Sequence, residues 1–157
     1  TYTGMAGFGV AGLLGLGELL LRRPWGAPRR LIGWVAFGFY LSGVATSALA
    51  SQVNWGAVFW QEPRMVTSLN ILAVALLVQL AALFPWGWLP ALLSVLLPPA
   101  IVWANRSARL VLHPPNAIRD SDATGIQLAF LGMFVLCFLA AAVITWYALV
   151  SRRGRRA

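Results

Sequence analysis

Five long apolar stretches dominate this 157-residue sequence and limit what it can fold into. A helix needs about 20 consecutive apolar residues to cross the hydrocarbon core of a bilayer. We expect spans at Tyr2–Leu21, Leu31–Ala50, Met65–Phe84, Leu89–Ala104 and Gly125–Val150. The sequence therefore predicts an all-α fold, a polytopic bundle of five transmembrane helices that forms a single integral membrane domain over residues 1–157.

The composition excludes most soluble classes. Hydrophobic residues make up 60% of the chain and charged residues only 10%, against roughly 25% charged residues in an ordinary soluble domain. The single cysteine, Cys137, leaves no intrachain disulfide and no CxxC or CxxCH motif. The sequence also lacks a phosphate-binding loop, a zinc-binding HExxH and a nucleophile elbow. Whether the protein is an enzyme stays open, and no catalytic acid–base constellation favours it.

The arginines predict an orientation in the lipid bilayer. The expected connections are residues 22–30, 51–64, 85–88 and 105–124, followed by the tail 151–157. Alternating crossings place 22–30, 85–88 and the tail on one side, which then carries eight of the twelve arginines. Because positive charge favours the cytoplasmic side, we expect these segments and the C-terminus to be cytoplasmic. The net charge of +8 is thereby explained without a nucleic-acid partner.

Small and polar residues within the spans indicate how the helices pack. Gly7, Ala11 and Gly15 recur at every fourth position, a pattern that lets helices approach closely in lipid. Glu18 lies four residues before Arg22, so we expect a local ion pair between them. Interhelical hydrogen bonds are expected from the other polar side chains in the spans, which are Ser42, Thr46, Thr67, Asn70 and Gln79.

The first expected outer loop, residues 51–64, is rich in aromatic residues. Trp55 and Phe59 are four residues apart, so a short helix on the membrane surface would present both on one face, with Trp60 and Glu62 beside it. One interpretation is an aromatic belt, because tryptophan is enriched at membrane interfaces generally. The other is an aromatic platform for a flat, apolar ligand.

The second expected outer loop, residues 105–124, contains the only histidine of the chain, His113, followed by Pro114 and Pro115. A lone loop histidine is often only a polar surface residue, but imidazole is also the commonest metal ligand in proteins. The arginines of the outer side would suit the two carboxylates of a haem; they are Arg64, Arg106, Arg109 and Arg119.

At these two loops the sequence resembles the CcmC family of haem-handling proteins of cytochrome c maturation. The family's outer segment has the form WGxxWxWDxRLTS, and the counterpart here runs from Trp55 to Ser68. It matches at Trp55, Gly56 and Arg64, has an aromatic residue at Phe59 and an acid at Glu62, and carries Thr67-Ser68 slightly displaced. Downstream, Leu97-Pro98-Pro99, Trp103, Asn105 and Leu112-His113-Pro114-Pro115 resemble the family's later motifs. The opening residues resemble its second span, so the chain corresponds to the last five spans of a six-span fold.

The resemblance implies that haem b is held on the periplasmic face of a bacterial inner membrane and passed to a periplasmic haem chaperone, within a complex of other membrane subunits. It assigns His113 as an axial ligand of the haem iron. The haem-contacting residues that follow from it, together with the outer arginines, are Trp55, Phe59, Trp60, Glu62, Arg64, Arg106 and Arg109. The sequence departs from the family at Gln61, where the family has tryptophan, and at Glu62, where it has aspartate.

Two functions from different classes remain after this comparison. The leading one is a membrane protein that presents haem for cytochrome c assembly. The alternative is a diverged relative that serves as a structural subunit of a larger membrane complex, and an exporter permease has little support. The family's first haem histidine would lie upstream of Thr1, so we expect a further span there. A His-x-Pro just before Thr1 would favour haem handling, whereas a start codon near Thr1 would favour the structural subunit.

Overall fold

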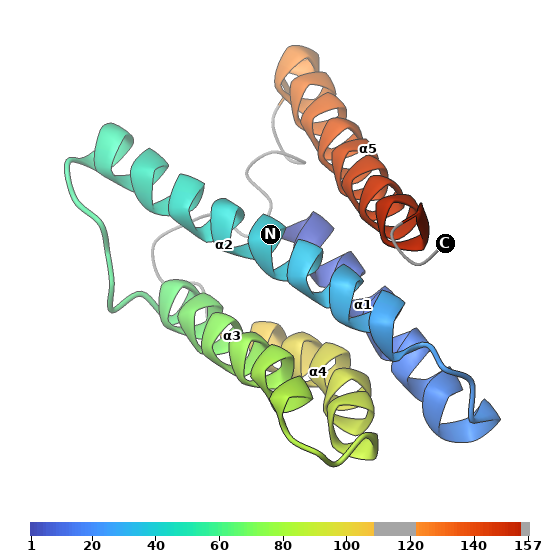
Figure 1. The fold of residues 1–157 in the computed structure, drawn as a ribbon. Coiled ribbons are helices and arrows are strands. Elements are labelled where there is room, and N and C mark those ends of the chain that lie inside the picture. The colour runs from blue at the N-terminus through green and yellow to red at the C-terminus, as the bar shows by residue number, and fades with distance from the viewer. Residues whose placement is uncertain (109–121, 155–157) are drawn as a thin grey trace.

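The computed structural model describes residues 1–108 and 122–154, the last three as backbone only, and in these residues it contains helices and no strands (Figure 1). The elements are α1 (Tyr2–Leu21), α2 (Gly26–Trp55), α3 (Pro63–Leu80), the short 3₁₀ helix η1 (Ala81–Leu83), α4 (Trp88–Ser107) and α5 (Thr124–Gly154). Five of the described helices are long and apolar enough to span a membrane. The predicted all-α membrane bundle is therefore confirmed.

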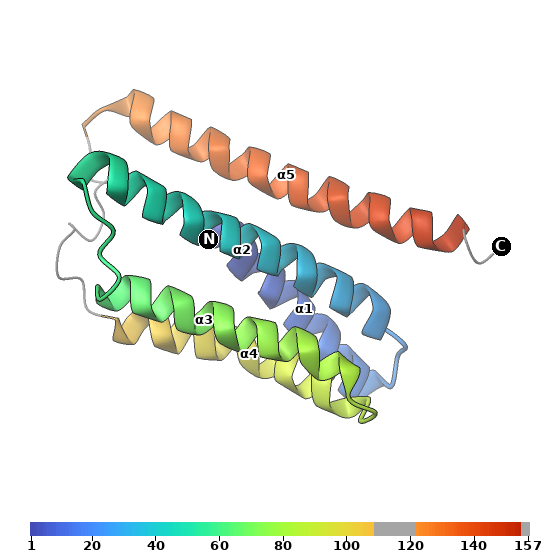
Figure 2. The same ribbon diagram turned by 60° about the vertical axis from the view of Figure 1, so that its left-hand side comes forward.

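The connections between helices lie at two opposite ends of the bundle (Figure 2). The α1–α2 connection, Arg22–Trp25, and the α3–α4 connection, Phe84–Gly87, share one end, which we call the arginine end. The α2–α3 connection, Gly56–Glu62, lies at the other, which we call the aromatic end. Successive helices thus run in alternate directions, as repeated crossings of one membrane require.

Helix α2 is longer than the sequence predicted. It begins at Gly26 rather than Leu31, because Pro28 can occupy a first turn, where its missing N–H is not needed. At the aromatic end it continues past Ala50 and ends only at Gly56, whose φ of 72° is a conformation that glycine adopts without strain. The expected loops 22–30 and 51–64 are correspondingly shorter.

Helix α4 continues through Pro98 and Pro99 and stops at Ser107, beyond the expected end at Ala104. Pro98 has no N–H, so it cannot donate the helical hydrogen bond to the Ser94 carbonyl. Gly12 of α1 faces this carbonyl so closely that a Cβ at Gly12 would lie 2.9 Å from the Ser94 oxygen and 3.0 Å from Pro98 Cγ. The prolines therefore mark a close contact between α1 and α4.

Helix α1 is the central helix of the bundle and packs most extensively against α2 and α4. A Cβ at Gly7 would lie 2.7 Å from Ala36 Cβ of α2, and one at Gly15 would lie 2.7 Å from the Ala91 carbonyl oxygen of α4. Ala11 between them is buried. The predicted close packing of these small residues is confirmed, and helices of the same chain fill it.

Helix α5 lies along α2, has a smaller contact with α1, and stands apart from α3 and α4 (Figures 1 and 2). None of the residues in its most apolar window is buried. A gap of about 350 Å³ separates it from α1 and α2, lined mainly by apolar residues such as Val10, Phe39 and Phe138. Most of the surface of α5 is therefore available to lipid or to another protein.

Candidate functional site

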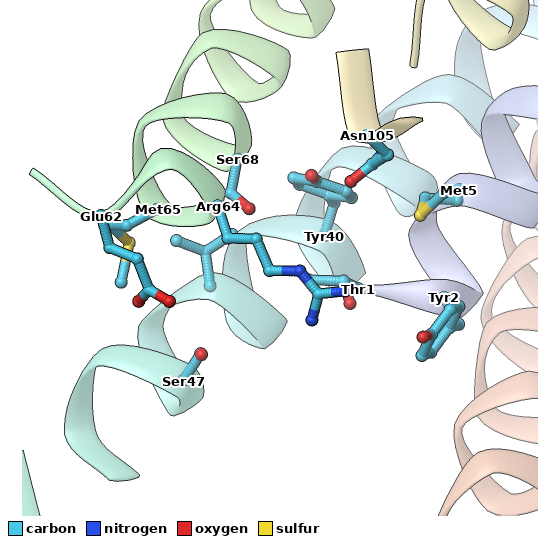
Figure 3. Close-up of a pocket in the computed structure, with 11 residues that line it drawn as sticks. Thr1, Tyr2, Met5, Tyr40, Ser47, Glu62, Arg64, Met65, Ser68 and Asn105 are labelled. Carbon is cyan, nitrogen blue, oxygen red and sulfur yellow. The ribbon is translucent and has the colours of Figure 1, made fainter. Parts of the chain in front are cut away.

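A pocket of about 370 Å³ opens at the aromatic end, between α1, α2, α3 and α4 (Figure 3). This volume lies in the range of small-molecule sites. The residues that line it come from four separate helices and the α2–α3 connection, and they are Thr1, Tyr2, Met5, Tyr40, Val44, Ser47, Glu62, Arg64, Met65, Ser68 and Asn105.

Helical spacing explains how two walls of this pocket form. Tyr40, Val44 and Ser47 recur at three- and four-residue intervals and so share one face of α2. Arg64 and Ser68 are four residues apart and share a face at the start of α3. The Tyr40 ring is 1% exposed, and its phenol hydrogen-bonds with the Ser68 hydroxyl. This contact joins the two walls.

Arg64 supplies the positive charge of the pocket. Its side chain is extended across the pocket toward Thr1 and Tyr2, whereas the Glu62 carboxylate points toward Ser47 (Figure 3). Among residues 1–108 and 122–154, no ion pair or hydrogen bond occupies the Arg64 guanidinium. A guanidinium without a protein partner, beside hydroxyl and amide groups, is suited to bind a carboxylate or phosphate.

The aromatic residues next to this pocket form a cluster, although not on the surface helix that the sequence predicted. That prediction is wrong because Gly56, at positive φ, ends α2 directly after Trp55. The turn that follows is held by hydrogen bonds from Ser51 Oγ to the Ala57 carbonyl, 2.8 Å, and from the Glu62 amide to the Phe59 carbonyl, 3.1 Å. It returns Phe59 to Trp55, with ring centroids 6.2 Å apart.

The cluster is open to its surroundings. Trp55, Phe59 and Trp60 are 53%, 38% and 58% exposed. Val58, by contrast, packs against the buried core. The exposed aromatic surface is therefore formed by its neighbours Trp55, Phe59 and Trp60.

The structure brings only some of the predicted site residues together. Glu62 and Arg64 line the pocket, but Arg106 is exposed in the last turn of α4 and does not line it. Arg109 and His113 lie outside the described residues. Within the described part of the chain, no group of three His, Cys, Asp or Glu side chains could hold a metal ion. Sequence reasoning missed the α2 wall formed by Tyr40, Val44 and Ser47, whose only signal is shared helical spacing.

A second cluster of charged and polar groups lies at the arginine end and corrects the predicted Glu18–Arg22 pair. Arg22 has left α1 with a φ of 50°, and Glu18 instead pairs with Arg29 of α2, with Nε and Oε2 2.9 Å apart. Arg29 Nη1 also donates to the Pro90 carbonyl at 2.9 Å and to Ser94 Oγ at 3.0 Å. One buried guanidinium therefore connects α1, α2 and α4.

The remaining polar residues of the spans differ in their partners. Ser42 and Thr46 donate to carbonyls of their own helix, Gly38 and Ser42, so the predicted interhelical bonds are wrong for these two. Gln79 of α3 is buried with its amide against Gly33 of α2, which is an interhelical contact but does not test the predicted hydrogen bond. Asn70 is exposed on α3.

Comparison with known proteins adds no identification. No protein-family model, no curated protein and no solved structure matches the chain.

Proposed function

We propose that this protein handles haem, presenting haem b at the aromatic end and passing it to a periplasmic haem chaperone during cytochrome c assembly. One observation carries the proposal: the exposed aromatic cluster of Trp55, Phe59 and Trp60 adjoins, within a few residues of chain, the Arg64 guanidinium, which has no partner among the described residues. The resemblance of this segment to the tryptophan-rich segment of the CcmC family also supports it.

The described residues fit the shape and charge of haem. Haem is a flat, apolar disc with two carboxylates at one edge, and exposed aromatic rings offer flat apolar contact. Arg64 offers the cation that a carboxylate prefers, with Ser47, Ser68 and Asn105 as further polar groups of the same pocket. Glu62, the only acid among the described residues that line the pocket, directs its carboxylate away from the guanidinium (Figure 3).

In this proposal each residue binds or orients the ligand, and none acts as an acid or base. If haem binds, it would supply an iron atom that an imidazole can ligate, and His113, the only histidine that the sequence offers, would hold it. The aromatic cluster excludes water from the porphyrin edge, and Arg64 sets which edge faces the pocket. For transfer to a chaperone, His113 would have to release the haem.

The arginines support an orientation in which this site is periplasmic. Arg22, Arg23 and Arg30 are exposed at the arginine end, whereas the charge of Arg29 is compensated by Glu18. Positive charge near helix ends favours the cytoplasmic side of a bacterial inner membrane. We therefore assign the arginine end, where α5 also ends (Figure 2), to the cytoplasm, and the aromatic end to the periplasm.

Haem titration of the purified protein in detergent tests the proposal with matched variants. We expect His113→Ala to abolish or greatly weaken binding. Arg64→Gln should weaken it about tenfold or more, because a hydrogen bond to a charged group contributes about 1.5–3 kcal/mol. The control is Arg30→Gln, at an exposed arginine of the opposite end. Binding that is unchanged in Arg64→Gln, or lost equally in Arg30→Gln, contradicts the assignment.

The aromatic cluster is tested in the same titration. Trp60 and Trp88 are both 58% exposed, but they lie at opposite ends of the bundle. We expect Trp60→Ala to lower haem affinity about two- to tenfold, in line with the energy of an aromatic pair, and Trp88→Ala to leave it unchanged. Equal effects of the two substitutions would show that the loss is unspecific.

A second function is favoured by one observation, the exposure of α5. A spanning helix without a single buried residue in its most apolar window is suited to a structural subunit that packs against other membrane proteins. In that case the purified protein would bind no haem when haem is supplied, and α5 would become buried only in a larger complex. Cross-linking from Leu136, 67% exposed on α5, distinguishes the two functions.

A further inference from the structure

Three exposed arginines lie at the arginine end of the bundle. Arg22 and Arg23 belong to the α1–α2 connection, and Arg30 belongs to the first turns of α2. No ion pair or hydrogen bond joins their guanidiniums to a residue in 1–108 or 122–154. Of the described acids only Glu18 is near this end, and it is already paired with Arg29. The surface of this end therefore carries positive charge that no described side chain compensates.

The α1–α2 connection is anchored by the packing around Trp25. Arg22 ends α1 at a φ of 50°, and the Trp25 amide donates to the Arg23 carbonyl at 2.8 Å. The Trp25 ring lies against Gly17 so closely that a Cβ at Gly17 would overlap it. The Trp25 carbonyl accepts from the Arg29 amide at 2.9 Å. Arg22 and Arg23 are thus presented from a short, anchored turn, which reduces the entropy that is lost when they bind a ligand.

Aromatic residues at the same end indicate the depth of these arginines in the bilayer. The α3–α4 connection shares this end (Figure 2), and Trp86 and Trp88 are 57% and 58% exposed there. The Phe84 and Trp86 rings are stacked, with centroids 6.1 Å and planes 13° apart. Exposed tryptophans are typical of the zone where hydrocarbon meets the lipid headgroups. The arginines of this end therefore lie at the depth of the phospholipid phosphates.

We propose that the arginine end binds an anionic phospholipid, with Arg22 and Arg23 on the headgroup phosphate and Arg30 adding to the attraction. A guanidinium offers paired N–H groups that match the oxygens of a phosphate. The positive charge favours a headgroup with net negative charge over a zwitterionic one, and the apolar helices beneath contact the acyl chains. Such binding is a property of the folded bundle, separate from the effect of arginines on membrane insertion, and it does not depend on haem binding.

Native mass spectrometry of the purified protein in detergent tests the proposal by counting bound lipids. Phosphatidylglycerol, which is anionic, and phosphatidylcholine, which is zwitterionic, are titrated with the same acyl chains. We expect the wild type to prefer phosphatidylglycerol about a hundredfold. Arg22→Gln/Arg23→Gln should lower that affinity about thirtyfold, or about 2 kcal/mol, and leave phosphatidylcholine binding unchanged. The control is Arg106→Gln, at an exposed arginine of the opposite end. Equal wild-type affinities for the two lipids, no loss in the double variant, or an equal loss in Arg106→Gln would each overturn the proposal.

Salt and free phosphate test the same site in the wild-type protein, so the result does not depend on whether a variant folds. Raising ammonium acetate from about 0.1 M to about 1 M shortens the Debye length from about 10 Å to about 3 Å. This should weaken phosphatidylglycerol binding and leave phosphatidylcholine binding unchanged. Inorganic phosphate at the concentration of the lipid should not displace it, because free phosphate lacks the acyl chains that add to membrane binding. Phosphatidylglycerol binding that ignores salt, or displacement by equimolar phosphate, would overturn the assignment of an anionic lipid.

Discussion

The buried ion pair of Glu18 and Arg29 gives the sharpest prediction about stability. The two side chains are 24% and 7% exposed, and Arg29 makes hydrogen bonds to three groups on α1 and α4. Removing one partner of a buried pair costs about 3–5 kcal/mol because it leaves the other charge uncompensated. We expect Glu18→Gln to reach the lower end of this range, since Glu18 is partly solvated and a glutamine oxygen can still accept from Arg29.

Arg29→Met should destabilise the bundle less than Glu18→Gln. Glu18 keeps access to the membrane surface, and Ser94 Oγ still donates to the Pro90 carbonyl at 2.7 Å. The loss is then mainly that of the hydrogen bonds from a charged group, about 2–3 kcal/mol. Arg30→Met, at the exposed neighbouring residue, removes the same charge from the same end and should change stability by less than about 0.5 kcal/mol.

Reversible unfolding in mixed micelles, followed by circular dichroism as the fraction of denaturing detergent rises, measures these free energies. The double variant Glu18→Gln/Arg29→Met should be less destabilised than the sum of the two single variants by about 1 kcal/mol or more, because the pair interacts directly. Additive effects, or a Glu18→Gln variant as stable as the wild type, would refute the account of the pair as a connection between helices.

Two further predictions concern glycines that the fold requires. Gly15→Ala should destabilise the bundle by about 1–3 kcal/mol, because its Cβ would lie 2.7 Å from the Ala91 carbonyl oxygen. Gly132→Ala should not destabilise it, because a Cβ there meets nothing within 4 Å. Thermal unfolding compares the two variants, and equal melting temperatures would contradict the close packing. Gly56→Ala places a Cβ at a φ of 72°, which costs about 1–2 kcal/mol, and should displace the aromatic turn. The control is Gly87→Ala, where a Cβ also has free space. Equal haem affinities of the two variants would show that the turn is irrelevant to binding.

The sequence predicted the fold well because hydropathy along the chain decides which segments enter a membrane. The five spans and the close approach at Gly7 and Gly15 follow from composition and spacing alone. Helix ends were less accurate, since residues such as Gln52 and Asn54 are polar yet remain helical until Gly56 interrupts the backbone. Polarity predicts where the membrane ends, and backbone geometry decides where the helix ends.

Long-range contacts explain what the sequence could not predict. The i, i+4 rule paired Glu18 with Arg22, but Arg22 turns out of the helix before Pro24, and Arg29 reaches Glu18 from the next helix. In the pocket, Glu62 and Arg64 are close in sequence and were found together, whereas Tyr40 and Asn105 join them only through packing of α2 and α4. No local pattern contains that information.

The central claim, that the protein handles haem, is tested most directly by the visible absorption spectrum of the purified protein after expression with haem supplied. We expect a Soret band, with equimolar haem by pyridine haemochrome analysis, that is lost in His113→Ala while the variant stays folded and inserted in the membrane. A wild-type protein without haem, or a His113→Ala variant that retains its full haem content, would contradict the claim.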